Sequence, residues 1–514
     1  MAEFGRRYPK QPMSQRMPCP AAPGPLEEYA AQFDELFGSL AQRRGFRDYL
    51  QGLLVPRDRN KTLTALVGAE PVVGAQHREV QRLQFFLSES GWNQDKIKMR
   101  RLEGLQSDPT TRAHDNGALV IDETGDRKDG TKTAHVSRQY LGSVGKTDNG
   151  IVAVSSLWAD EHVYYPLDVL PYTPAPRLPK GKADLAFRTK PQIAVELVDA
   201  ALAAGVSFRA VVADSLYGDN PTFERTLEAA SLPFVLGVKP SRSIWAPEDE
   251  VHSPAEAVAE LRWNGPEDPG DWTQVVRSFR DGHTETWWAV DLSYGPYGPD
   301  QARRMVVATT DPATLPDLTT WYLTTNLPHP ARADRADIPF APADLAEVIR
   351  LYALRNWVEQ SYRQVKQELG WADFMVRTDR AIRRHWELVC CAFTFCWRHC
   401  FGTTTDGPPA ALADRTIDGA PPIARDAHPE TSTGRGENGG QAIRRARGRN
   451  HAARTVLAAG PATRPQLAPA VAHAQALLAG MVRSAPAAGT PGDPRLGCRW
   501  SPAQSVSPHL TKYR

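Results

Sequence analysis

Residues 345–371 read LAEVIRLYALRNWVEQSYRQVKQELGW, and the apolar residues in this stretch recur at helical spacing. Four polar residues stand at positions i, i+3, i+7 and i+14 within it: Tyr352, Arg355, Glu359 and Lys366. At about 100° per residue these four project within roughly 60° of one another. We therefore expect one helix that presents an acid flanked by two bases along a single face. The alternative is an ordinary amphipathic helix with an ion pair between Arg355 and Glu359.

Two apolar runs upstream of this helix each end in an aspartate. Ala118–Ile121 is followed by Asp122, and Phe208–Ala213 is followed by Asp214. A single carboxylate in such a place more often caps a helix or begins a turn. Two of them in one α/β unit favour a metal site, because divalent cations need several hard oxygen ligands from different elements. The helix would supply the third carboxylate through Glu359.

Composition and hydrophobic period change several times along the 514 residues. Strands followed by a helix and a buried strand are typical of an α/β fold. We expect the following segments: a disordered N-terminus (1–25), a small helical domain (26–110), the first part of an α/β core (111–239), a β-rich insertion (240–340), the second part of the core with the helix described above (341–402), and a low-complexity, disordered tail (403–514).

The composition indicates a cytoplasmic protein without a membrane segment. Hydrophobic residues make up 41% of the chain, which suffices for a substantial core. No run of about 18 apolar residues occurs, and the N-terminus has no apolar region of the kind that a secretory signal needs. The six cysteines lack the spacing of a disulfide framework, which points to a reducing compartment.

A net charge of +2 says little about partners, but basic residues are clustered. Such runs are usually solvated helix faces, and a nucleic-acid partner becomes the better interpretation only beside a site for phosphates. The clusters lie at three places: Arg43 to Lys61, Lys96 to Arg101, and Arg377 to Arg384.

Residues 141–147 read LGSVGKT, which ends like a phosphate-binding P-loop. A P-loop needs its first glycine at position 140, and that residue is Tyr140. We therefore expect a hairpin turn beside the first acidic strand instead of a nucleotide site. Lys146, in this turn, is a candidate for contact with DNA.

The helix pattern Y-x2-R-x3-E-x6-K resembles the YREK signature of bacterial insertion-sequence transposases with a DDE triad. The wider sequence resembles one branch of them, the insertion-sequence family numbered 701, over roughly residues 26–400. The matching stretches are Ile121–Gly125, Gln139–Asn149, Ala213–Gly218 and Lys366–Gly370. A chance match to the four-residue signature together with two upstream aspartates on strands is improbable.

This resemblance implies a ribonuclease-H-like catalytic core, a mixed sheet with flanking helices, interrupted by a β-rich insertion. It also implies that the small helical domain before the core, residues 26–110, binds DNA. By position, Asp122, Asp214 and Glu359 resemble the three catalytic carboxylates and would be the metal ligands. The implied cofactor is a pair of Mg²⁺ ions, or Mn²⁺ in their place, about 3.5–4 Å apart.

The implied activity is that of a DNA transposase. Water attacks at the transposon end and frees a 3′-hydroxyl, and that hydroxyl then attacks target DNA. Tyr352, Arg355 and Lys366 beside Glu359 are expected to contact the DNA backbone. The partners are double-stranded terminal repeats and target DNA. Because two ends must be paired, we expect a homodimer or a larger assembly in the DNA complex.

The tail departs from the family. Residues 403–514 are rich in Ala, Pro, Arg and Gly, and the usual ending of the family is hard to find in them. This departure keeps a second interpretation open, in which the chain is a catalytically inactive transposase remnant that only binds DNA.

Overall fold

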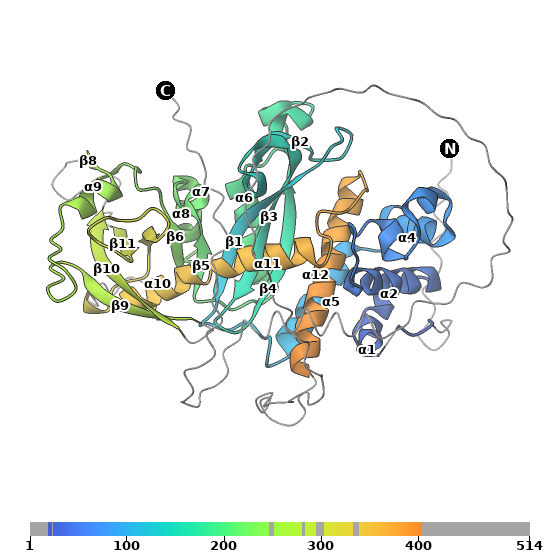
Figure 1. The fold of residues 1–514 in the computed structure, drawn as a ribbon, viewed down its shortest axis with the longest axis horizontal. Coiled ribbons are helices and arrows are strands. Elements are labelled where there is room, and N and C mark those ends of the chain that lie inside the picture. Colours follow the sequence, from blue (N-terminus) through green and yellow to red (C-terminus); the bar gives the residue numbers. More distant parts are fainter. Residues whose placement is uncertain are drawn as a thin grey trace, which may run out of the picture. The chain divides into compact units, whose positions relative to one another are not determined.

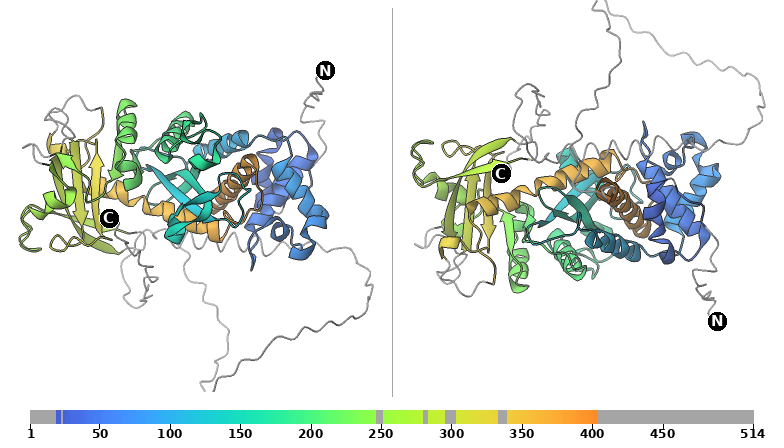
Figure 2. Two further views of the ribbon diagram at one scale, coloured as in Figure 1. Left: turned by 90° about the horizontal axis from the view of Figure 1, so that it is seen from above. Right: turned by 90° about the horizontal axis from the view of Figure 1, so that it is seen from below.

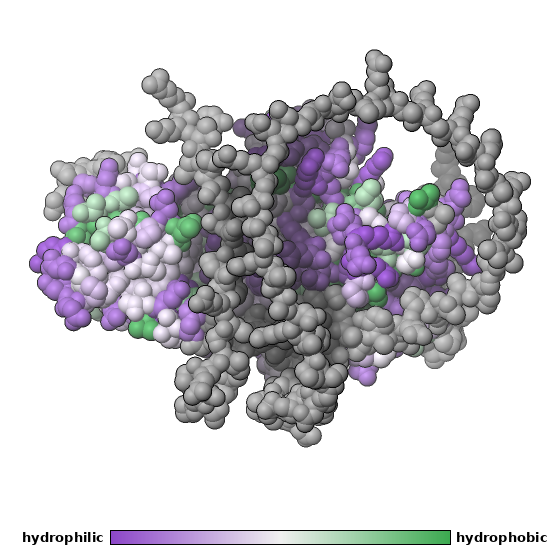
Figure 3. Space-filling view, viewed as in Figure 1, coloured by the Kyte–Doolittle hydropathy of each residue, from purple (hydrophilic) through white to green (hydrophobic). Residues whose placement is uncertain are grey.

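The computed structural model describes residues 19–22, 24–245, 251–279, 283–294, 303–332 and 339–402. The expectation of a disordered tail at 403–514, and most of that for the N-terminus, falls outside the described residues. Within them, no helix is long and apolar enough to cross a membrane. Where Figure 3 shows the described residues, exposed apolar residues are scattered among hydrophilic ones.

A large mixed sheet forms the centre of the described structure (Figure 1). Ten strands take part: β1 (Ala118–Arg127), β2 (Ser137–Leu141), β3 (Lys146–Ala159), β4 (Tyr164–Tyr172), β5 (Ala210–Ala213), β6 (Phe234–Gly237), β9 (Thr273–Ser278), β10 (Thr284–Tyr294), β11 (Arg303–Thr309) and β12 (Thr320–Thr325). A separate pair consists of β7 (Ile244–Trp245) and β8 (Val251–His252).

Helices flank this sheet and extend beyond it. They are α1 (Pro25–Ala31), α2 (Leu40–Leu54), α3 (Leu63–Leu66), α4 (Arg78–Ser88), α5 (Gln94–Ser107), α6 (Lys190–Ala203), α7 (Ser215–Gly218), α8 (Pro221–Ala229), α9 (Pro254–Ala259), α10 (Leu345–Ala353), α11 (Asn356–Gln367) and α12 (Asp379–Gly402).

The first five core strands follow the order β4-β3-β1-β5-β6. β4, β3 and β1 are antiparallel neighbours, whereas β1, β5 and β6 are parallel. β2 shares one edge of β3 with β4, so the long β3 serves both. A meander of antiparallel strands continued by parallel ones, with helices alongside, confirms the expected ribonuclease-H-like α/β fold.

The parallel strands form where the sequence is continuously apolar. Ala118–Ile121 and Ala210–Ala213 are wholly buried, as strands covered on both faces require. The crossover between these strands contains α6, which begins with a capping box: Thr189 accepts from the backbone of Gln192, and the Gln192 side chain accepts in return.

Within residues 240–340, strands β9 to β12 continue the same sheet (Figure 2). β12 pairs antiparallel with β6, with Leu323 opposite Gly237, and β11, β10 and β9 follow outward. One face of these strands packs into a second apolar cluster that includes Trp272 and Trp288. The tryptophans of this segment are therefore largely accounted for by packing.

The helical N-terminal segment shares its core with the sheet through α12. This long helix contacts α2, α4, α5 and β4. Buried Arg101 of α5 donates to Glu387 of α12 at 2.8 Å and to two backbone carbonyls of β4. One continuous apolar cluster runs from Leu26 to Trp397.

The segment expected as one helix is divided in two. α10 packs against β5, β6 and the strands β9–β11, and α11 packs against β1 and β4. Between them, Arg355 N donates to Tyr352 O, and Val358 N donates to Arg355 O, which are i→i−3 bonds. Figure 1 shows the two helices running end to end across the sheet. The tight turn lies at Leu354 and Arg355, inside the four-residue signature.

Candidate active site

Two aspartates lie side by side where β5 ends. Ile121 of β1 pairs with Ala213 of β5, so the next residues along these parallel strands, Asp122 and Asp214, are neighbours. Adjacent strands stand about 4.8 Å apart. Contrary to the sequence-based expectation, β1 does not end at Asp122 but continues to Arg127, paired with β3.

The two carboxylates have different surroundings. Asp122 is only 6% exposed. The side chain of Asp214 is 33% exposed, and its Oδ1 accepts from Leu216 N at 3.0 Å to cap α7. Its Oδ2 remains directed at Arg355. The capping role that could have explained Asp214 alone is therefore present, but it uses only one of the two oxygens.

Arg355 connects both aspartates to Glu359. Its Nη2 lies 3.4 Å from Asp122 Oδ2 and 3.7 Å from Asp214 Oδ2, and its Nη1 lies 3.9 Å from Glu359 Oε1. A single guanidinium thus faces all three carboxylates that the sequence singled out. Glu359 stands at the open side, with its side chain 71% exposed. The i, i+4 ion pair that was the alternative interpretation of this helix is present as part of the cluster.

Burial sets the protonation of Asp122. It raises the pKa of this carboxyl to about 7, against the opposing effect of Arg355 and with a further increase from Asp214. Burial lowers the pKa of the Arg355 guanidinium, but the neighbouring acids Asp122, Asp214 and Glu359 raise it by more, so the net shift of its pKa is upward. The site therefore concentrates negative charge that one arginine offsets only in part.

Tyr352 lies on the last turn of α10, with its side chain partly buried. Its ring meets Trp321 edge-on, with centroids 5.2 Å apart. Its hydroxyl approaches Gly237 so closely that a Cβ there would stand 2.5 Å from it. A glycine at position 237 therefore leaves the room that the hydroxyl of Tyr352 needs, and contacts with β6 and β12 fix the position of this tyrosine.

Lys366 does not project freely beside Glu359. Its Nζ lies 2.7 Å from Asp126 Oδ1 and donates to Gly125 O at 3.2 Å. Asp126 also accepts from Trp371 Nε1 at 3.1 Å. Lys366 therefore fastens the end of α11 to β1, and this partner was not visible in the sequence.

Lys146 is exposed at the start of β3, directly after the turn that joins it to β2. Gly145 adopts a left-handed conformation there, with φ 66°. Ser143 Oγ donates to Gly125 O at 2.5 Å, which places the turn against β1. Strand, turn and strand replace the strand, loop and helix of a P-loop, so the nucleotide-binding interpretation is wrong.

Many of the clustered basic residues hold the protein together. Arg47 is buried and pairs with Glu27 and Asp34, both at 2.6 Å. Arg384 is buried, donates to Leu87 O at 3.0 Å and stacks over the ring of Trp92. Others donate to backbone carbonyls or pair with acids: Arg57, Arg59, Lys61, Lys98, Arg100, Arg101, Arg380 and Arg383. Arg44, Lys96 and Arg377 are exposed.

Two further groups adjoin the carboxylates and were missed in the sequence. Glu123 accepts from Tyr217 Oη at 3.1 Å and pairs with Lys190. Tyr362 of α11 is 2.6 Å from Ser155, the residue opposite Asp122 on β3. The adjacent Asp122-Glu123 pair was a visible signal, but the Tyr362 contact depends on how α11 lies over the sheet.

Carboxylate oxygens are the ligands that Mg²⁺ prefers, so the three carboxylates are chemically suited to a divalent cation. They already share one positive charge, that of Arg355. In the described part of the chain, however, no three acidic, histidine or cysteine side chains are gathered closely enough to hold a metal ion. Arg355 stands between the oxygens that would have to converge. The three carboxylates are suitable ligands for the metal, but Arg355 would have to move to make room for the ion.

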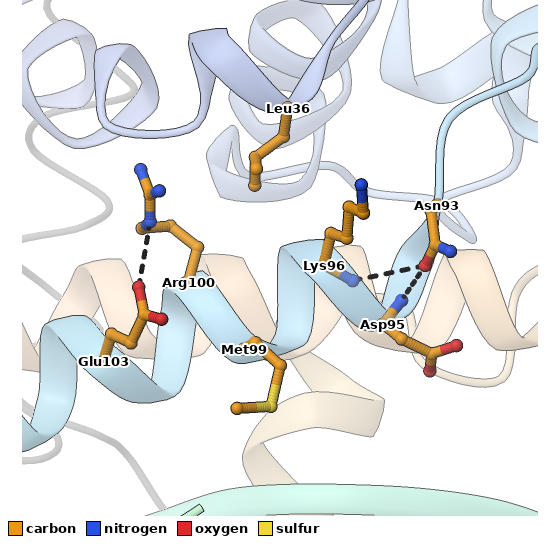
Figure 4. A pocket seen from close by; sticks show the side chains of 7 residues that line it. All are labelled: Leu36, Asn93, Asp95, Lys96, Met99, Arg100 and Glu103. Atoms are coloured by element: carbon orange, nitrogen blue, oxygen red, sulfur yellow. Dashed lines mark hydrogen bonds and ion pairs between the residues drawn. The ribbon is translucent and has the colours of Figure 1, made fainter.

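A shallow recess of about 280 Å³ lies elsewhere, along α5 (Figure 4). Asn93 caps the helix beside it by accepting from Asp95 N and Lys96 N, and Arg100 pairs with Glu103. None of the three carboxylates lines it. The recess is therefore separate from the carboxylate cluster, which stays the candidate site.

Comparison with known proteins places the chain among relatives whose descriptions concern DNA cleavage and transposition. The sequence model of a family described as DDE superfamily endonuclease matches residues 32–294, a range that includes Asp122 and Asp214 and ends before Glu359. A probable transposase for insertion sequence element IS701 of Microchaete diplosiphon is 34% identical over 360 residues. That alignment covers 70% of this chain and 83% of the relative.

Proposed function

The chain belongs to the DDE superfamily endonucleases, among the transposases similar to that of insertion sequence element IS701, and on this basis we propose that it cleaves DNA at element ends and joins them to target DNA. In the first step, water attacks the phosphodiester at the element end and releases a 3′-hydroxyl. In the second, that hydroxyl attacks a target phosphodiester, and the target strand supplies the leaving 3′-oxygen.

We assign the catalytic carboxylates to Asp122, Asp214 and Glu359. The observation that carries this assignment is the single guanidinium of Arg355, which lies within 4 Å of all three. The acids that share this cation come from two adjacent strands and one helix, and the sequence also singles out each of them.

Two Mg²⁺ ions, or Mn²⁺, would supply charge stabilisation to the phosphate and activate the nucleophile. Asp122, Asp214 and Glu359 would hold them. The different exposure of these acids suits the two sides of such a site: Asp122 anchors it at the buried sheet, and Glu359 closes it at the surface where DNA arrives. Asp122 must lose its proton to serve as a ligand.

DNA contacts follow from the same geometry. Arg355 and Tyr352 adjoin the carboxylates, and exposed Lys146 lies on the hairpin that contacts β1, so these three are proposed to contact the DNA backbone. Lys366 could reach a phosphate only by leaving Asp126, and we assign it first to positioning α11. Double-stranded terminal repeats and target DNA are the proposed partners, with at least two copies of the chain pairing the ends.

The test is cleavage of duplex DNA that carries the terminal repeats, in Mg²⁺, by wild type and Glu359→Gln. Because Glu359 is largely exposed, the substitution should leave the fold intact and lower cleavage by more than about a hundredfold. Glu260→Gln, at an exposed glutamate following α9, is the matched control and should cleave like wild type.

Absence of cleavage by wild type, with specific binding of the repeats retained, would instead support the second candidate, an inactive remnant that only binds DNA. That candidate rests on the unusual composition of residues 403–514. Equal cleavage by wild type and Glu359→Gln would overturn the assignment of the third carboxylate.

A further inference from the structure

Arg355 is partly buried, with its side chain 19% exposed, and it is held differently from the buried arginines Arg101 and Arg47. Arg101 donates to Glu387 and to two backbone carbonyls at 2.7–2.8 Å. Arg47 makes contacts of 2.6–3.1 Å with two carboxylates. These are the lengths expected of charge-assisted hydrogen bonds. Both arginines are fixed parts of the packing.

Arg355 has no contact of that length with its three acids. The separations are 3.4, 3.7 and 3.9 Å, and its Nε is buried without a hydrogen-bond partner in the described structure. A buried donor left unpaired is costly. The guanidinium is therefore centred among three charges without being bound closely to any of them, as a counter-ion is.

The backbone at Arg355 is also suited to adjustment. The residue precedes α11 without a side-chain cap, at the turn where i→i−3 bonds separate α10 from α11. A short tight turn inside a helical segment often marks a hinge. The arginine can thus change position without unwinding either helix.

We propose that Arg355 is a resident counter-ion of the carboxylate cluster, displaced when a divalent cation binds between Asp122, Asp214 and Glu359. This inference rests on the proposed function. Mg²⁺ binds oxygens at about 2.0–2.1 Å, so the three carboxylates must close around the ion. A guanidinium between them would obstruct that closure and repel the ion. Once displaced, Arg355 can donate to a DNA phosphate at the rim beside Glu359.

The test measures Mn²⁺ binding without DNA, by titration with electron paramagnetic resonance of free Mn²⁺. The proteins are wild type, Arg355→Gln and Arg355→Lys. Removal of a competing positive charge a few ångströms from the ion should tighten binding by on the order of tenfold in Arg355→Gln. Arg355→Lys keeps the charge and should remain close to wild type. Arg363→Ala, at an exposed arginine of α11, is the matched control and should bind like wild type.

Thermal unfolding provides a second readout. Without metal, Arg355→Gln should unfold at a lower temperature than wild type, because three acids lose their counter-ion. Saturating Mn²⁺ should raise its unfolding temperature by more than it raises that of wild type, since the tighter ion stabilises the folded state more. Both measurements are independent of DNA cleavage.

The outcomes separate this inference from the proposed function. Equal or weaker Mn²⁺ binding by Arg355→Gln would overturn the counter-ion role and leave the catalytic assignment intact. Binding that persists in Asp122→Asn would place the ion elsewhere and overturn both. If wild type and Arg355→Gln both fail to bind Mn²⁺, the counter-ion role is likewise overturned.

Discussion

Asp122 is the most deeply buried of the three carboxylates, and its burial couples the site to pH. The pKa of its carboxyl is raised to about 7 from a usual value of 3.8, chiefly by desolvation. An acid with a higher pKa in the folded protein binds its proton more tightly when folded. Its contribution to stability is complete below about pH 4 and is lost as the pH rises through 7.

Metal-free protein should therefore lose stability between about pH 4 and pH 7 through Asp122, and most of this loss separates a measurement at pH 5 from one at pH 8. A rise of roughly three pKa units corresponds to at most about 4 kcal/mol. Asp122→Asn removes this titration and should unfold at a higher temperature than wild type at pH 8. Calorimetry at both pH values is the measurement. A wild-type pH dependence that Asp122→Asn retains in full would contradict it.

DNA cleavage should show the opposite trend with pH. The carboxylate form of Asp122 is the one that can hold a cation, so activity at limiting Mg²⁺ should rise as the pH increases through about 7. Saturating metal competes with the proton and should shift the midpoint to lower pH. A midpoint that does not move with metal concentration would argue against Asp122 as the titrating ligand.

Gly237 tests the placement of Tyr352. A Cβ at Gly237 would lie 2.5 Å from the tyrosine hydroxyl and 3.3 Å from the ring carbon that carries it. Gly237→Ala should destabilise the protein by about 1–3 kcal/mol through this overlap. Adding Tyr352→Phe removes the overlapping oxygen and should recover part of the loss in a denaturant titration. No recovery would show that Tyr352 does not cause the constraint.

At the scale of elements, α11 is attached to the sheet at three points along its length. Arg355 faces Asp122, Tyr362 contacts Ser155, and Lys366 pairs with Asp126. The helix advances about 16 Å from its first cation to its last. The four-residue step along β1 covers about 13 Å. The long side chains of Arg355 and Lys366 bridge the difference between these two lengths. Glu359 lies on the helix between these two attachments.

Breaking the attachment by Lys366 and Asp126 should disturb stability in a non-additive way. Lys366→Met and Asp126→Asn should each destabilise the protein by roughly 2–3 kcal/mol, since each leaves a partly buried partner unpaired. The double variant should lose less than the sum, with a coupling of about 1–2 kcal/mol.

Urea denaturation gives these values, and Arg363→Ala on the exposed side of α11 should stay within about 0.5 kcal/mol of wild type. Strict additivity of Lys366→Met and Asp126→Asn would mean that the two residues do not act as a pair. In that case Lys366 would be released for DNA contact, as its place in the signature first suggested.

The sequence predicted which carboxylates lie together at the candidate site where local chemistry decides it. Apolar runs before Asp122 and Asp214 gave both strands, and helical spacing placed Glu359 with Arg355. It could not predict contacts set by how α11 lies across the sheet, such as Lys366 with Asp126. It also could not show that Arg47 is engaged by Glu27 and Asp34, because only folding brings those acids to it. The sequence also did not predict the division at Leu354 and Arg355, because the residues on both sides of it have helical spacing.

At the scale of the whole described structure, the helical N-terminal segment and the central sheet share α12 and one apolar cluster. The pair formed by Arg101 and Glu387 lies inside this junction, and both side chains are almost completely buried. The helices before β1 should therefore not unfold independently of the sheet.

Arg101→Met should destabilise both parts together, by about 3–5 kcal/mol, because it leaves Glu387 buried without its cation. Far-ultraviolet circular dichroism reports mainly the helices, and tryptophan fluorescence also reports the sheet. Their denaturation midpoints should fall together. Two separated transitions would show that the helical segment is an independent domain.

The most direct test of the central claim is metal-directed cutting of the protein chain. Fe²⁺ bound in place of Mg²⁺, with ascorbate and peroxide, generates radicals that cut the backbone next to the ion. If Asp122, Asp214 and Glu359 hold the metal, three cuts should appear, one near each residue. All three should weaken with added Mg²⁺ and vanish in Asp122→Asn. Cuts at other positions, or cuts at these that survive Asp122→Asn, would contradict the account.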